Sequence, residues 1–170
     1  LMPLMRELGE RWNSGRGSIA EEHFFGFYLR NKLGARFHHR RQNQTGPKLL
    51  LARLPWVLHE IGLLLFALDA CDHGYQTVLL GANMPLEELP AAIRKSGSDA
   101  VVLSGVIEPP EDVLTRKLPW LVANISVPVF VGGDIAAKNF DILRRSGVQI
   151  IGTDIDTGIK QLSETLEFNN

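Results

Sequence analysis

The sequence predicts an α/β fold with a five-stranded parallel sheet, preceded by a small helical cap that forms part of a bundle. Two observations predict it. Five short apolar runs alternate with helical patterns from residue 48 onward, whereas residues 1–41 show helical periodicity alone. Such strand–helix units join parallel strands by right-handed crossovers, and the flavodoxin-like order 2-1-3-4-5 suits five strands. We therefore divide the chain into a cap, residues 1–42, and an α/β domain, residues 43–170.

Two helices are expected in the cap. Leu4, Leu8 and Trp12 recur at the four-residue spacing of one helical face, before a break rich in serine and glycine. Ser18 and Glu21 then match a capping box, which predicts the start of a second helix. The apolar stripe of that helix comprises Phe24, Phe25, Tyr28, Leu29 and Leu33.

The second helix ends in a basic cluster, which consists of Arg36, His38, His39, Arg40 and Arg41. Cations at the carboxyl end of a helix complement its dipole, and we favour this interpretation over a nucleic-acid patch. The formal net charge of −1 also argues against non-specific nucleic-acid binding by this chain.

The predicted strands and helices of the α/β domain alternate without interruption. The strands are expected at 48–53, 76–80, 100–104, 128–131 and 149–151. The helices are expected at 60–71, 86–95, 111–122, 136–145 and 157–166.

Composition excludes several classes of protein. The chain has 170 residues, of which 45% are hydrophobic and 22% charged, as in ordinary globular domains. The single cysteine, Cys71, excludes a disulfide framework and a cysteine-based zinc site. No apolar run approaches the ~18 residues of a membrane span, and the start lacks the features of an export signal. We therefore expect a cytoplasmic protein without membrane partners, and further protein upstream, because the chain opens inside a helical pattern.

Ligands of parallel sheets bind beyond the carboxyl ends of the strands. The expected loops there are 54–59, 105–110 and 132–136. They bring together His59, Ser104 and the pair Gly132-Gly133, with Gly62 in the following helix. An imidazole there can ligate a metal, and glycines let a backbone approach a bulky group. Each residue also has an ordinary interpretation: a capping or solvated histidine, a small polar strand end, and a tight turn.

These residues resemble the pattern of the cobalamin-binding domains. The resemblance implies that His59 is the lower axial ligand of cobalt in place of the cofactor's own benzimidazole. It further implies that the displaced nucleotide tail enters a slot between the first helix of the α/β domain and the sheet. Gly62, Ser104, Gly132 and Gly133 occupy the matching positions of that family.

The cap narrows the resemblance to light-sensing MerR-type transcriptional regulators of the CarH and LitR kind. Trp12, followed after nine residues by Glu22 and His23, is similar to the cap that covers the upper face of adenosylcobalamin in those proteins. Without the resemblance, Trp12 is more often explained as a core anchor, and Glu22 and His23 as a boundary between solvent and core.

Three further residues are expected near the cofactor: Val57, Asn13 and Trp56. The acid that the family places two residues before the histidine is Val57 here, so Glu60, a backbone carbonyl or water would have to orient the His59 ring. Asn13 stands where the light sensors carry a histidine that takes the upper cobalt position after photolysis. Trp56 could stack against the ring or fill its space.

Three functions are compatible with these residues. The first is a sensory domain that binds cobalamin and has no catalytic turnover. We expect no catalytic residues, because no nucleophile–base–orienter set appears at the expected ligand edge. This first function implies self-association, and DNA contact only through an upstream domain. The second is a corrinoid shuttle subunit of a methyltransferase system, which Val57 and the cap disfavour. The third is a regulatory domain that has lost cobalamin and binds haem, another tetrapyrrole or only a protein partner.

Overall fold

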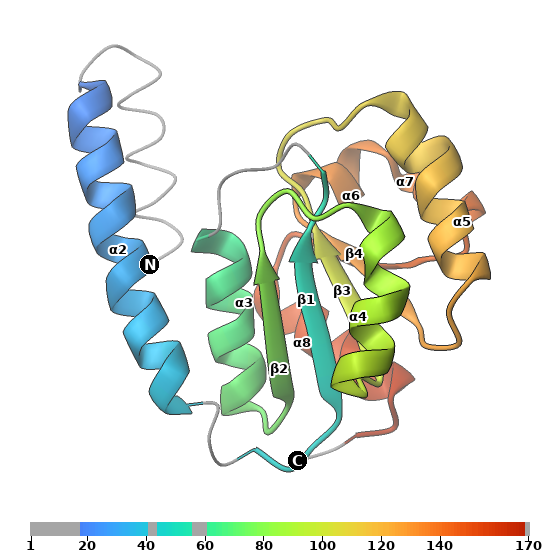
Figure 1. Ribbon diagram of the computed structural model, residues 1–170, viewed down its shortest axis with the longest axis horizontal. Helices are drawn as coiled ribbons and strands as arrows, with labels where there is room; N and C mark the ends of the chain where they lie inside the picture. Colours follow the sequence, from blue (N-terminus) through green and yellow to red (C-terminus); the bar gives the residue numbers. More distant parts are fainter. Residues whose placement is uncertain (1–17, 41–43, 56–60, 169–170) are drawn as a thin grey trace.

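The computed structural model describes residues 18–40, 44–55 and 61–168, except for the side chains of Ile19 and Glu22, and contains a five-stranded parallel sheet (Figure 1). The strands follow the order β2-β1-β3-β4-β5, and all neighbouring pairs are parallel, which confirms the predicted topology. Their bounds are β1 Lys48–Arg53, β2 Gln76–Gly81, β3 Ala100–Ser104, β4 Val129–Gly132 and β5 Gln149–Gly152.

The helices also follow the predicted alternation. They are α2 Ile19–Arg40, α3 Ile61–Asp72, α4 Leu89–Ser96 after the 3₁₀ turn Leu86–Glu88, α5 Leu118–Ala123, α6 Asp134–Lys138, α7 Phe140–Arg145 and α8 Ile155–Thr165. Two predicted helices are divided. A π-helical turn, Val113–Lys117, precedes α5 and Pro119, whose missing N–H interrupts an α-helical ladder. The second division is at Asn139, which has non-helical backbone angles.

Apolar side chains cover both faces of the sheet, as expected where crossover helices flank parallel strands. In β1, Leu49 and Leu51 join the core beneath α2, α3 and α8. Leu50, Ala52 and Leu54 join the opposite core beneath α4 and α5. Because side chains alternate along a strand, this division determines which face each residue at the strand ends occupies.

The helix α2 begins as the sequence predicts. The backbone N–H of Ser18 donates to a carboxylate oxygen of Glu21 at 2.8 Å, and the backbone N–H of Glu21 donates to Ser18 Oγ at 3.1 Å. These two hydrogen bonds form the expected capping box. The preceding predicted helix and the boundary at residue 42 lie outside the described residues, and the division into two domains stays a prediction.

The buried stripe of α2 agrees with the predicted one at Phe25, Leu29 and Leu33 and differs from it at Phe24 and Tyr28. Leu29, Leu33 and Phe37 are buried against α3, whereas Phe24 is 73% exposed and Tyr28 is 51% exposed. Two overlapping series of apolar residues, four apart, run through this helix, and only the one containing Leu29 faces the domain. The amino-terminal half of α2 extends beyond the start of α3 (Figure 1).

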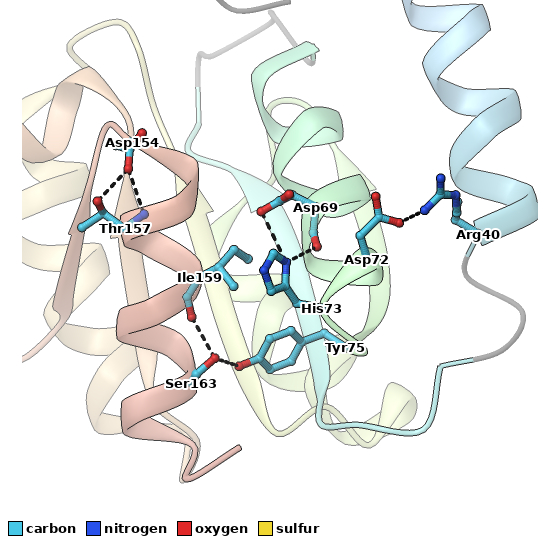
Figure 2. Close-up of polar contacts among 9 residues, drawn as sticks. All are labelled: Arg40, Asp69, Asp72, His73, Tyr75, Asp154, Thr157, Ile159 and Ser163. Atoms are coloured by element: carbon cyan, nitrogen blue, oxygen red, sulfur yellow. Dashed lines mark hydrogen bonds and ion pairs between the residues drawn. The ribbon is translucent and has the colours of Figure 1, made fainter. Parts of the chain in front are cut away.

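The basic end of α2 lies at the end of α3. Arg40 forms an ion pair with Asp72, the last residue of α3 (Figure 2). His38 and Arg36 are exposed, and His39 stacks edge-on to His38 with ring centroids 5.9 Å apart. His38, His39 and Arg40 thus lie in the last turn of α2, where cations complement the helix dipole, and Arg41 lies outside the described residues. Within the described segments, no helix combines the length and apolarity needed to cross a membrane.

Candidate functional site

Three neighbouring strands end with residues that share one face of the sheet. In the parallel register, Arg53 of β1 is paired with Ser104 of β3, which is paired in turn with Gly132 of β4. By alternation from Leu51 and Phe130, these strand ends face the layer that contains α3 and α8. The structure therefore brings Ser104 and Gly132 to the same edge, as the sequence predicts.

Arg53 is the central side chain of this edge, and the sequence analysis missed it. The residue is only 1% exposed, and its Nη1 donates a long hydrogen bond of 3.4 Å to Ser104 Oγ. The sequence signal for this residue was an arginine directly after the apolar run at residues 49–52. The alternation of the strand then places its side chain under α3 instead of in solvent.

Gly62 lies on the other side of the same guanidinium. A Cβ atom added to Gly62 would lie 3.4 Å from Arg53 Nη2, which is ordinary van der Waals distance. The guanidinium therefore lies between the first turn of α3 and the end of β3. Two predicted cofactor-binding residues, Gly62 and Ser104, are brought together with Arg53 between them.

Contacts within the protein account for the glycine pair. Gly133 has a φ of +88°, and a Cβ there would lie 2.5 Å from the carbonyl oxygen of Gly105. A Cβ on Gly132 would lie 3.0 Å from Ile151 Cγ1. The backbone N–H of Gly105 donates to Gly132 O at 3.2 Å, and that of Gly133 donates to Gly152 O at 2.8 Å. Both glycines are thus required by the tight approach of three loops, and their role toward a cofactor stays a prediction.

Several predicted site residues fall where the structure gives less information. Trp12, His59 and Glu60 lie outside the described residues, as do Asn13, Trp56 and Val57. Glu22 belongs to α2, but its side chain is not among those described. His23 is exposed in the first part of the same helix. The proposed contacts of these residues with a cofactor therefore stay predictions.

Most polar contacts of α3 and α8 lie away from this edge (Figure 2). Burial raises the pKa of Asp69, and nearby His73 partly offsets that effect. Tyr75 shares a hydrogen bond of 2.9 Å with Ser163 of α8, and burial raises the pKa of Tyr75. The Asp69–His73 contact lies at the end of α3, and the Tyr75–Ser163 hydrogen bond joins the residue before β2 to α8, so both support the scaffold.

The start of α8 is capped by a side chain. Asp154, the residue before the helix, accepts hydrogen bonds from the backbone N–H of Thr157 at 2.8 Å and from its hydroxyl at 2.6 Å. These bonds lower the pKa of Asp154. Among the described residues, no group of three or more His, Cys, Asp or Glu side chains could hold a metal ion.

An open cleft of about 480 Å³ lies beside the end of β2. Its walls come from α2, α3 and β2 and include Arg30, Phe37, Leu64 and Leu79. The cleft therefore adds a hollow with mixed polar and apolar walls at the carboxyl end of β2.

Comparison with known proteins gives consistent matches. Residues 1–36 match the family described as the B12 binding domain. The chain is 34% identical over 162 residues to the HTH-type transcriptional repressor CarH of Myxococcus xanthus, covering 92% of this chain and 52% of that protein. It is 31% identical over 150 residues to the repressor CarA of the same organism, covering 88% of this chain and 50% of that protein. The chain thus spans about half the length of these relatives.

Solved structures show the same fold at lower identity. A cobalamin-binding protein from Desulfitobacterium hafniense DCB-2 matches with a TM-score of 0.59 and 24% identity, covering 94% of this chain and 77% of that one. The monomethylamine corrinoid protein of Methanosarcina barkeri matches with a TM-score of 0.74 and 17% identity, covering 95% and 78%. At these identities the matches establish the flavodoxin-like architecture.

Proposed function

The chain belongs to the same family as the CarH and CarA transcriptional repressors, and we propose that it is a cobalamin-binding regulatory domain without catalytic turnover of its own. The observation that carries this proposal is the relationship to CarH over most of the chain. The match of residues 1–36 to a B12 binding domain supports the same ligand. We propose adenosylcobalamin as the bound form, self-association as the response, and DNA binding through a part of the protein outside this chain.

The proposed ligand of cobalt is His59, which belongs to the connection between β1 and α3. That connection follows the carboxyl end of a central strand, where ligands of parallel sheets bind. A neutral imidazole is a common metal ligand in proteins. Glu60 is proposed to orient the ring in place of the acid that Val57 replaces.

The upper face is assigned to the cap. Trp12 is proposed to cover it, with Glu22 and His23 contributing from α2. The exposure of His23 and the extension of α2 beyond the start of α3 support a role for this half of the helix at a ligand (Figure 1). Cobalamin, when bound, would supply a cobalt ion for the proposed ligand His59.

Two small residues line the space between α3 and the ends of the strands, which favours a bulky ligand there. Gly62 has no side chain and Ser104 has a small one, so neither would obstruct a ligand between α3 and the sheet. The flexible side chain of Arg53 is the group between them. The small walls support the proposed roles of Gly62 and Ser104.

The experiment is reconstitution in the dark. The purified chain is mixed with adenosylcobalamin, freed of excess cofactor, and examined by absorbance and molar mass before and after green light. Co-elution of the corrinoid with a spectrum different from that of the free cofactor supports the proposal. A free-cofactor spectrum with no co-elution refutes it.

Two further outcomes would reassign the function. Methyl transfer between the bound corrinoid and a partner enzyme would favour a shuttle subunit. A Soret band in the purified protein would favour a haem-binding domain.

A further inference from the structure

We propose that the residues after α8 form a strap across the linker between α2 and β1, and that the ring of Phe168 anchors this strap. The strap lies at the amino-terminal ends of β1 and β2, at the other end of the sheet from the candidate site (Figure 1). Through the linker, it controls how firmly the last turn of α2 is held.

The chain reverses directly after α8 in a strained turn. Glu167 has a left-handed φ of +50°, and the backbone N–H of Phe168 donates to Ser163 O at 3.0 Å. This hydrogen bond is typical of a Schellman motif, whose left-handed residue is usually glycine. A glutamate in that conformation costs free energy, so the turn needs a compensating contact.

The ring of Phe168 supplies this contact. It packs edge-on against Tyr75, with ring centroids 4.9 Å apart and an angle of 62° between the planes. Tyr75 is fully buried and directly precedes β2. The ring also lies against Gly46 in the linker, where an added Cβ would be 2.5 Å from Phe168 Cζ and 2.6 Å from Gly74 O. The linker therefore carries a glycine where the ring and a neighbouring turn approach its backbone most closely.

Hydrogen bonds tie the linker to the turn between α3 and β2 beside this ring. The backbone N–H of Gly46 donates to Gly74 O at 3.0 Å, and Gln76 Nε2 donates to Gly46 O, also at 3.0 Å. The backbone N–H of Gln76 donates to Pro47 O at 3.0 Å. Because the ring of Phe168 packs against Gly46, its departure would open these bonds to water.

The linker is connected in turn to the end of α2. Gln44 Nε2 donates to Arg40 O at 3.2 Å, and this carbonyl belongs to the last turn, where helix geometry provides no intrahelical donor. Only Thr45 separates Gln44 from Gly46, so the position of this cap follows that of the strapped linker. Release of Phe168 should therefore loosen the last turn of α2 as well as the linker.

The test compares amide hydrogen exchange, resolved by residue, in the wild-type chain and in Phe168→Ala, both without cofactor. Loss of the ring should speed exchange of the Gly46 and Gln76 N–H groups and of the last turn of α2 by about tenfold. Exchange in β3, at the centre of the sheet, should keep its wild-type rate. Phe140→Ala, at a phenylalanine that is 51% exposed, is the matched control and should change none of these rates.

Glu167→Gly should have the opposite effect. Glycine adopts the left-handed conformation without strain, and the substitution keeps the ring of Phe168. Exchange at Gly46 should therefore slow by about threefold. If Phe168→Ala does not fold, this variant decides alone, and a wild-type rate at Gly46 would refute the strap.

Gln44→Ala separates the two steps of the coupling. It removes only the cap of α2, so exchange should speed up in the last turn of that helix while Gly46 and Gln76 stay protected. Combined with Phe168→Ala, it should add no further increase in the last turn, because both substitutions act through one path.

Three results would overturn the proposal. Equally faster exchange in β3 of Phe168→Ala would mean that the ring supports the whole domain instead of a strap. Unchanged exchange at Gly46 would mean that the ring does not hold the linker. Faster exchange at Gly46 with an unchanged last turn of α2 would mean that the carboxyl-terminal residues have no control over this helix.

Discussion

The guanidinium of Arg53 lies 3.4 Å from the hydroxyl of Ser104, where β1 and β3 end side by side. This relationship joins a residue that the sequence analysis assigned to the cofactor with one that it overlooked. It also makes the ligand edge a packed and hydrogen-bonded part of the domain.

Ser104→Ala should lower the free energy of unfolding by about 1 kcal/mol, because the buried guanidinium loses a hydrogen-bond acceptor. Urea unfolding followed by circular dichroism measures the difference. The control is Ser126→Ala, at an exposed serine, which should stay within about 0.5 kcal/mol of the wild type. Equal stabilities of the two variants would show that the contact contributes nothing.

Gly133→Ala should destabilise the domain by more than about 2 kcal/mol, because it combines a strained positive φ with a close contact to Gly105 O. Gly97→Ala is the matched control: its φ is +62°, but nothing lies within 4 Å of the added Cβ. Thermal unfolding should give Gly133→Ala a lower melting temperature than Gly97→Ala. The reverse order would contradict the proposed steric requirement.

Phe37→Ala should cost about 3 kcal/mol if the docking of α2 is part of cooperative unfolding, because Phe37 is 7% exposed in the core against α3. Phe27→Ala, on the same helix but 66% exposed, should change stability by less than about 0.5 kcal/mol. Chemical unfolding of both variants checks which face of α2 is buried against the domain. Similar losses would mean that both aromatic rings are buried in solution.

Asp154→Ala should destabilise α8 at pH 7 and much less at pH 2. Hydrogen bonds from Thr157 lower the pKa of Asp154 in the folded chain, so the contribution is present above the unfolded pKa near 3.8 and is lost as the pH falls through the lower folded value. Melting temperatures of the variant and the wild type across this range measure the effect. A pH-independent difference would argue against a contribution from the ionised carboxylate.

His59→Ala should reduce cobalamin uptake by at least about tenfold, because the proposed axial ligand is lost. His73→Ala is the matched control at an exposed histidine and should bind like the wild type. Absorbance after reconstitution reports both occupancy and axial ligation. Unchanged uptake and spectrum in His59→Ala would remove this residue from the proposed site.

The sequence predicts the architecture because the signals of that architecture are local. Alternating apolar runs and helical patterns give the elements, with bounds that differ by at most two residues. The capping box of Ser18 and Glu21 depends on residues three apart and is confirmed. The strand order then follows from the handedness of the crossovers.

The parts that were not predicted depend on distant contacts. The apolar residues of α2 fit two helical faces, and only packing against α3 selects the face of Leu29 and leaves Phe24 exposed. An arginine at a strand end is usually exposed, so the burial of Arg53 is visible only once α3 covers it. Likewise, the need for glycine at residue 133 arises from the Gly105 carbonyl, 28 positions earlier in the chain.

Among the described residues, the fully buried side chains of α2 begin at Leu29, and the partly buried Phe25 packs against the core before it. The second half of the helix is held against the domain by Leu29, Leu33, Phe37 and the Arg40–Asp72 ion pair, so the helix would pivot close to Leu29. The ten residues before Leu29 form an arm of roughly 15 Å, so a tilt of about 10° would carry its tip by roughly 3 Å. Small adjustments at the start of α3 would thus be amplified at the far end of α2.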